Sequence, residues 1–157
     1  MAEVIDKDLG WERIKKNFIS LHTRVIKAGV LESAGNGKRG VSIAFYASCN
    51  EYGTYGSGSE WQRIPARPFM GITADEQKMW RTPLTQAIDR IIGGANGTMD
   101  VKAELSVVGE KMKKDIKNNI GQNKYTPLAP STVARKGHNI PLMDSGALYD
   151  SIDYEVK

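Results

Sequence analysis

The stretch DVKAELSVVGEKMKKDIKNNIG, residues 100–121, decides the fold because it carries the clearest amphipathic pattern of the chain. Its lysines at positions 111, 113, 114 and 117 lie mostly off an apolar stripe, whose members recur every three or four residues: Val101, Leu105, Val108, Met112 and Ile116. Asp100 is a suitable N-cap residue and Gly121 a suitable stop. We therefore predict a helix over about 101–120 with one buried face.

Upstream of this helix, residues 73–93 predict a second long helix. Thr73 and Glu76 have the spacing of a capping box. Pro83 falls inside the pattern and is expected to kink the helix, since proline removes one backbone donor. Gly93 or Gly94 ends a segment whose apolar face is formed by Met79 or Trp80, Leu84, Ile88, and Ile91 or Ile92.

A third helix is predicted near the start of the chain, in GWERIKKNFISL (10–21). Asp8 is its candidate cap, and spacings of three and four residues place one apolar set on a shared face: Trp11, Ile14, Phe18 and Leu21.

Two short segments predict strands. TRVIKAGVLES is rich in β-branched and aliphatic residues and predicts a strand over about 24–32, and SIDYEV (151–156) alternates as a final strand. The stretch 41–54 is ambiguous, because Val41, Ile43 and Phe45 alternate as in a strand whereas Ser42 and Gly53 suit the ends of a helix. We favour a short helix over 43–52.

The remaining segments predict loops and short helical turns. IPARPFM (64–70) has two prolines and is expected to be extended, as an ordered arm or an edge. Ser131 can cap a short helix through Lys136, and 146–152 suits one or two helical turns. The whole pattern predicts one α+β domain over 1–157. In it, a small antiparallel sheet packs against two or three longer helices, with extended loops or arms at about 33–41 and 53–66.

Composition limits the classes of protein that fit. The chain has 157 residues, 40% apolar and 25% charged, as in ordinary globular domains. Its single cysteine, Cys49, cannot form an internal disulfide. No apolar run approaches the roughly 20 residues of a membrane span, and the first residues lack a signal pattern. We expect a protein made in the cytoplasm that binds no membrane.

The residues that could carry catalysis do not form a recognisable site. GNGKRG (35–40) has the glycine spacing of a dinucleotide loop, but a long helix and a second strand with an acidic end do not follow it. Cys49 with His22 or His138 lacks a supporting motif, and Asp144-Ser145-Gly146 is better explained as a turn or helix cap. Two histidines and one cysteine are too few for a metal site. We expect no enzyme activity, no cofactor and no metal.

Five segments, in order, carry a resemblance: VIKAGVLES, NEYGT, IPARPFM, YTPLAPSTVARKG and PLMDSGALYDSIDYEV. Together they resemble the neck, tail-completion or virion morphogenesis proteins of tailed phages and prophages, over about residues 8–157. Two positions depart from that family's pattern. Tyr125 stands where a tryptophan is common, and Asp-Ser-Gly replaces the commoner Asp-Thr-Gly. Neither change alters the expected chemistry, because serine and threonine cap alike.

The resemblance implies a structural role at the head–tail junction of a virion, assembled in the bacterial host cytoplasm. It implies a homo-oligomeric ring of about six or twelve subunits that contacts connector or adaptor proteins and the tail terminator or tail tube. DNA would pass through the lumen without sequence-specific binding. Alternative functions are a tail terminator capping the tail tube and a free nucleic-acid-binding protein that uses the lysine-rich face of helix 101–120.

The same resemblance suggests candidate interface residues. Arginine and aromatic residues anchor many interfaces, so a subunit interface is assigned to Arg67, Pro68, Phe69 and Tyr52. The alternative is that Phe69 is a core residue and Arg67 a local ion-pair partner. A separate hypothesis places Lys38 and Arg39, at the tip of GNGKRG, in the lumen or against a neighbouring ring.

Overall fold

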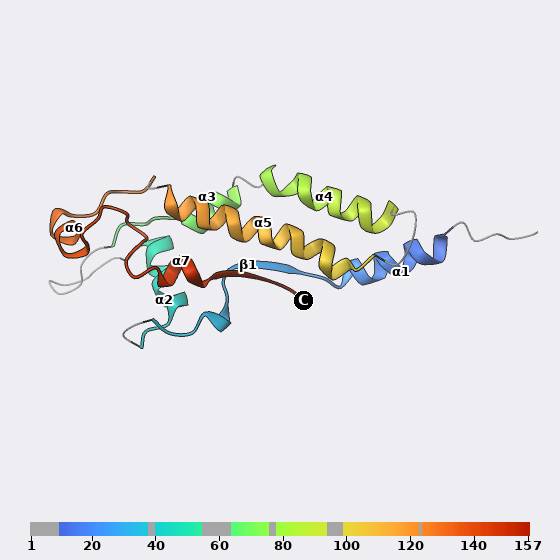
Figure 1. Ribbon diagram of the computed structural model, residues 1–157, viewed down its shortest axis with the longest axis horizontal. Coiled ribbons are helices and arrows are strands. Elements are labelled where there is room, and N and C mark those ends of the chain that lie inside the picture. Colours follow the sequence, from blue (N-terminus) through green and yellow to red (C-terminus); the bar gives the residue numbers. More distant parts are fainter. Residues whose placement is uncertain (1–9, 38–39, 55–63, 76–77, 94–98, 123) are drawn as a thin grey trace, which may run out of the picture.

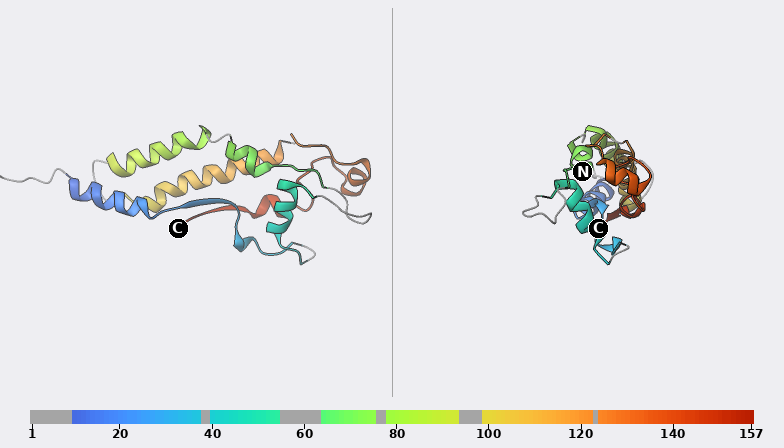
Figure 2. Two further views of the ribbon diagram at one scale, coloured as in Figure 1. Left: turned by 180° about the vertical axis from the view of Figure 1, so that it is seen from behind. Right: turned by 90° about the vertical axis from the view of Figure 1, so that its left-hand side faces the viewer.

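The computed structural model describes residues 10–37, 40–54, 64–75, 78–93, 99–122 and 124–157. Over these residues the chain forms seven α-helices and one two-stranded antiparallel sheet, which confirms the predicted α+β class. Figure 1 shows an elongated molecule with α5 along its middle, and the two views in Figure 2 show the same body as long and then narrow. No helix in the described segments has the length and apolar character needed to cross a membrane.

Helix α5 (Val101–Gly121) is the spine of the fold and matches its prediction to within one residue. The Asp100 carboxylate accepts hydrogen bonds from the backbone N–H groups of Lys102 and Ala103, at 2.9 and 3.3 Å, so the expected cap is present. The predicted stripe is buried except for partly buried Met112, and three more residues of this helix are also buried: Gly109, Asn119 and Ile120.

The sheet pairs the strand that follows α1 with the last strand of the chain. β1 (Ile26–Val30) pairs with β2 (Ile152–Val156) in a register that sets Ile26 opposite Val156. Apolar side chains from both strands pack toward α5, whereas Lys27 and Glu155 form a 3.9 Å ion pair across the ribbon. Both predicted strands are therefore confirmed, although β1 is shorter than expected because a 3₁₀ turn, Glu32–Ala34, follows it.

α1 (Trp11–His22) and α4 (Lys78–Gly93) pack near one end of α5. α4 contains Pro83 and ends at Gly93, one of the two predicted stops, while the kink predicted at Pro83 stays a prediction. The predicted apolar face of α1 is only partly right. Ile14 and Leu21 are partly buried and Leu21 packs against the core, whereas Trp11 and Phe18 are exposed and Asn17 is buried instead. The Asn17 side-chain amide donates to the Ile91 carbonyl at 2.8 Å, in the last turn of α4, where carbonyls have no helical partner. The predicted cap, Asp8, lies outside the described residues.

The predicted helix over 73–93 is divided. α3 (Phe69–Asp75) precedes α4, and Thr73 lies inside α3 rather than at an N-terminus. Its hydroxyl donates to the Phe69 carbonyl one turn back, at 2.6 Å, so it cannot act as the expected cap. The extended segment IPARP therefore runs directly into a helix at Phe69, while Glu76 lies outside the described residues.

Three short helices complete the fold at the opposite end from α1 (Figure 1). α2 (Ile43–Tyr52) has the predicted bounds and ends at Gly53, whose φ is 75°. α6 (Pro130–Lys136) begins with proline at its first turn, so Ser131 is not its cap. α7 (Ala147–Ser151) leads directly into β2.

Candidate subunit interface

Gly53 and the residues around it hold the end of α2 against the proline-rich arm. The backbone N–H of Arg67 donates to the Asn50 carbonyl at 2.7 Å, and that of Thr54 donates to the Ile64 carbonyl at 2.9 Å. A Cβ at Gly53 would lie 2.9 Å from the Ala66 nitrogen, and its φ is positive. Only glycine fits both demands, so NEYG and IPARPFM form one local unit.

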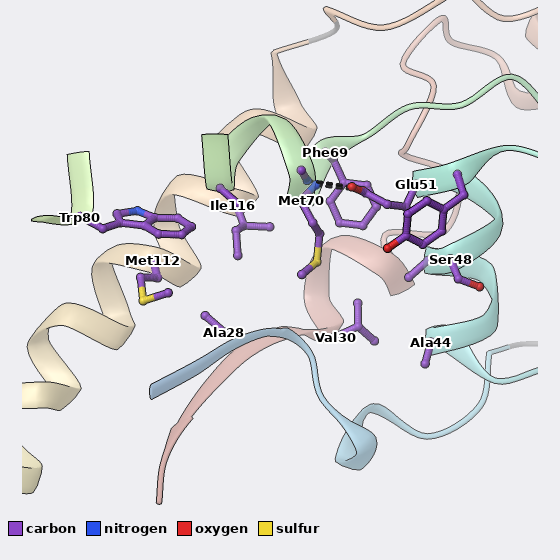
Figure 3. A pocket seen from close by; sticks show the side chains of 14 residues that line it. Ala28, Val30, Ala44, Ser48, Glu51, Phe69, Met70, Trp80, Met112 and Ile116 are labelled. Carbon is purple, nitrogen blue, oxygen red and sulfur yellow. Dashed lines mark hydrogen bonds between the residues drawn. The ribbon is translucent and has the colours of Figure 1, made fainter. Parts of the chain in front are cut away.

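Glu51 joins the same two segments through its carboxylate. Its Oε2 accepts from the Met70 N–H at 2.9 Å and its Oε1 from the Gly71 N–H at 2.7 Å. Figure 3 shows the Met70 bond. A carboxylate at the first turn of α3 satisfies donors that have no helical partner and lies at the favourable end of the helix dipole. Glu51 is therefore the cap of α3, a role that sequence spacing did not indicate.

Arg67 is buried, with 5% of its surface exposed. Its Nε donates to the Thr126 carbonyl at 3.4 Å, and no carboxylate of the described residues forms an ion pair with it. Burial lowers the pKa of its guanidinium below its ordinary value. Its local contact is thus to a backbone carbonyl rather than to an acidic side chain. Because the side chain is buried, little of it is accessible to a partner on this surface.

Phe69 is fully buried in the main core, so the core interpretation holds and its assignment to the subunit interface is wrong for the folded chain. Pro68 is partly buried. Tyr52 is 76% exposed and stays a candidate for partner contact. Lys38 and Arg39 lie outside the described residues, so their assignment to a lumen or a neighbouring ring stays a prediction.

An apolar groove of about 390 Å³ lies between β1, α2, α3, α4 and α5. Figure 3 shows side chains from these elements around it, including Ala28 and Val30 on one side and Met112 and Trp80 on another. Glu51 is the single charged residue among the described residues that line it. Sequence reasoning missed this groove, because its lining comes from five separate elements.

A second surface missed from sequence is the outer face of α1. Trp11, Phe18 and Ile19 are exposed by 66%, 56% and 59%. Lys15 and Lys16 are exposed on the same helix. Such neighbouring exposed apolar side chains are typical of contact surfaces. The predicted presence of Trp11 and Phe18 in a helical stripe was the only signal, and it pointed to the core.

The lysine-rich side of α5 is largely engaged within the protein. Lys111 pairs with Asp115 at 3.0 Å, and Lys113 pairs with Asp153 at 3.0 Å. The Lys117 ammonium lies 5.1 Å from the centre of the Tyr149 ring. These contacts reduce the free positive charge on which the nucleic-acid-binding alternative depends.

Two of the residues considered for catalysis make local hydrogen bonds to the backbone. His138 Nδ1 accepts from the Ile140 N–H at 3.3 Å, and Ser145 Oγ accepts from the Ala147 N–H at 3.4 Å at the start of α7. In GNGKRG, the Gly37 N–H donates to the Val41 carbonyl at 2.8 Å, which closes a turn before α2. Within the described segments, no three His, Cys, Asp or Glu side chains gather as metal ligands would.

Comparison with family models gave no match, and comparison with curated proteins and with solved structures gave none either.

Proposed function

We propose that this chain is a structural virion protein of a tailed phage or prophage, which forms or completes the head–tail junction as a ring through which DNA passes. The observation that carries the proposal is that the five segments of the sequence resemblance pack together in one unit.

The main core cluster contains residues from three of these segments: Phe69 from IPARPFM, Tyr125 from YTPLAPSTVARKG, and Ile152 from the last segment. Val30, from the first segment, packs against this cluster. The remaining segment, NEYGT, binds IPARPFM through Glu51 and the backbone, as described above. The five segments of the resemblance therefore contact one another within a single folded unit.

The surfaces of the molecule suit an assembling subunit. A closed ring needs two different patches per subunit, each contacting the other patch on a neighbour. The groove and the outer face of α1 are two such patches on one chain. We expect a homo-oligomer of about six or twelve copies, contacting connector or adaptor proteins on one side and the tail terminator or tail tube on the other.

The first experiment is a measurement of the mass of the purified protein by light scattering, followed by negative-stain imaging of the same sample. A closed ring of about six or twelve subunits supports the proposal. If the chain is a monomer, antibody labelling of particles from the host tests whether the protein lies at the head–tail junction. Failure to locate the protein at the head–tail junction would contradict the proposed function.

A further inference from the structure

We propose that the outer face of α1 in one copy docks into the apolar groove of the next copy, as the head-to-tail contact of the ring. The contact rests on the proposed ring and identifies its surfaces. In this contact Phe18 and Ile19 are the inserting side chains, and Glu51 is the charged residue that receives the lysines beside them.

The groove has the size and chemistry to receive apolar side chains. A cavity of about 150 Å³ holds one benzene-sized ring, so about 390 Å³ leaves room for roughly two large side chains. Ala44, Ala47 and Met70 contribute small or flexible apolar walls. Methionine adapts its shape to different neighbours, which is why it is common on contact surfaces.

The outer face of α1 presents large apolar side chains. Phe18 and Ile19 project from a helix whose opposite side is attached to α4 through Asn17. A helix that lays large side chains into an apolar groove is a recurrent mode of recognition between proteins. Burying a phenylalanine removes on the order of 150–250 Å² from water, so these side chains supply a substantial driving force.

The charges of the two surfaces are also complementary. Glu51 is the charged lining residue. Its two carboxylate oxygens accept the N–H groups of Met70 and Gly71, but no ion pair of the described residues includes it, so its negative charge has no paired cation. The α1 face carries Lys15 and Lys16, of which Lys15 lies 3.8 Å from Glu12 in an exposed, weak pair. Opposite charges at the edge of an interface select orientation and partner. The same charges disfavour pairing of two α1 faces, because their lysines would repel.

The positions of the two surfaces explain why contact continues beyond a dimer. α1 lies toward one end of the elongated body, whereas α2 and α3 beside the groove lie toward the other (Figures 1 and 2). After one α1 face has entered one groove, the pair still has a free groove and a free α1 face. Such a heterologous contact adds copies until the rotation between them closes a ring.

The test uses one variant for each surface. The α1 variant carries Phe18→Ser and Ile19→Ser, and the groove variant carries Ala44→Trp, which fills the groove from an exposed position. Each variant alone is expected to remain monomeric in sedimentation velocity at concentrations where the wild type assembles. In an equimolar mixture, the intact α1 face of the groove variant is expected to enter the intact groove of the α1 variant. The resulting dimer has twice the 17.3 kDa chain mass. Nothing larger should form, because the two surfaces left over are the mutated ones.

Val107→Ser is the matched control, since Val107 is 61% exposed on α5 and does not line the groove. It should assemble as the wild type does. Circular dichroism establishes that each variant is folded, and Ser48→Trp replaces Ala44→Trp if the latter does not fold.

Three results overturn the inference: a mixture that stays monomeric, a groove variant that assembles normally, or a wild type that is monomeric at every attainable concentration. None of these contradicts the proposed function, which particle labelling tests independently.

Discussion

At the scale of single residues, Gly109 sets how closely β2 approaches α5. A Cβ at this position would overlap the ring of Tyr154. The Lys113 ammonium lies 5.9 Å from the centre of the same ring and pairs with Asp153 at 3.0 Å. One glycine in the helix therefore makes room for an aromatic residue of the strand, and the charged residues beside it hold that arrangement.

Gly109→Ala should destabilise the protein by about 1–3 kcal/mol, because the added methyl group forces the Tyr154 ring out of its place. Alanine would otherwise stabilise a helix interior by roughly 0.5–1 kcal/mol relative to glycine. Urea unfolding measures the change. Gly121→Ala is the control within the same helix, since no atom lies within 4 Å of a Cβ there. A Gly109→Ala protein as stable as the control would contradict this account.

The pair between Lys113 and Asp153 predicts a pH dependence. The Lys113 hydrogen bond, followed by a backbone bond, holds the pKa of Asp153 below its ordinary 3.8. Its stabilising contribution is therefore complete above that value and is lost as the pH falls through the lower, folded-state pKa. The same bond raises the pKa of Lys113 above 10.5, so its contribution is lost only as the pH rises through that higher value.

Asp153→Asn should lower the free energy of unfolding at pH 7 by less than about 1 kcal/mol, because the aspartate side chain is 55% exposed and solvent screens the pair. The difference from wild type should shrink as the pH falls below 3.8. Urea unfolding at several pH values measures this. Glu12→Gln, which removes a looser 3.8 Å pair, is the control. A difference that persists unchanged in acid would argue against the pair as its cause.

At the scale of elements, the first turn of α3 depends on a cap from another helix. Glu51 lies 19 and 20 residues before the two N–H groups that it accepts from. This single side chain connects α2 to α3. The groove described above borders both helices, so the cap also shapes the proposed contact surface.

Glu51→Gln should cost about 0.5–2 kcal/mol, the range found for loss of a helix cap. The amide keeps one acceptor oxygen, but its NH₂ group faces an N–H donor where a carboxylate oxygen stood. The free energy of unfolding from urea titration measures the loss. Glu32→Gln, an exposed residue in the 3₁₀ turn, is the control and should change stability little. Equal stability of the two variants would rule out the capping role.

At the scale of the whole molecule, the chain is an elongated body with different surfaces toward its two ends. The core cluster around Phe69 lies toward one end, and the cluster around Ile91 and Leu105 lies near α1 toward the other. α5 contributes to both clusters and so joins them. A stiff spine of this kind keeps the groove and the outer face of α1 at a constant distance, which a closing ring requires.

Lys38→Glu with Arg39→Glu tests the remaining sequence prediction in the assembled particle. If these cations line the lumen or touch a neighbouring ring, their reversal should reduce DNA retention or infectivity, because the new carboxylates repel phosphate or mismatch the neighbouring surface. The measurements are packaged DNA and infectious titre. Lys102→Glu, at the exposed start of α5, is the control. Particles that retain DNA and infect normally would eliminate this role.

Sequence alone determined the features that depend on neighbours along the chain. The α5 helix with its Asp100 cap, the end of α4 at Gly93 and the two strands follow from periodicity and from cap and stop residues within a few positions. The bounds of α2 were predicted from a stretch whose pattern also suited a strand. These signals act over one or two turns, so a linear pattern contains them. The fold class followed from their order.

Only the tertiary structure decided which side of α1 is buried, what Thr73 does, and where the candidate interface lies. Asn17 bonds to a carbonyl 74 residues away, and Asn119 bonds to Thr73 across 46 residues. The groove likewise combines side chains from five elements. Contacts between distant positions depend on how the helices pack against one another. A periodic apolar pattern in the sequence does not distinguish a residue that is buried in the core from one that stays exposed on the surface.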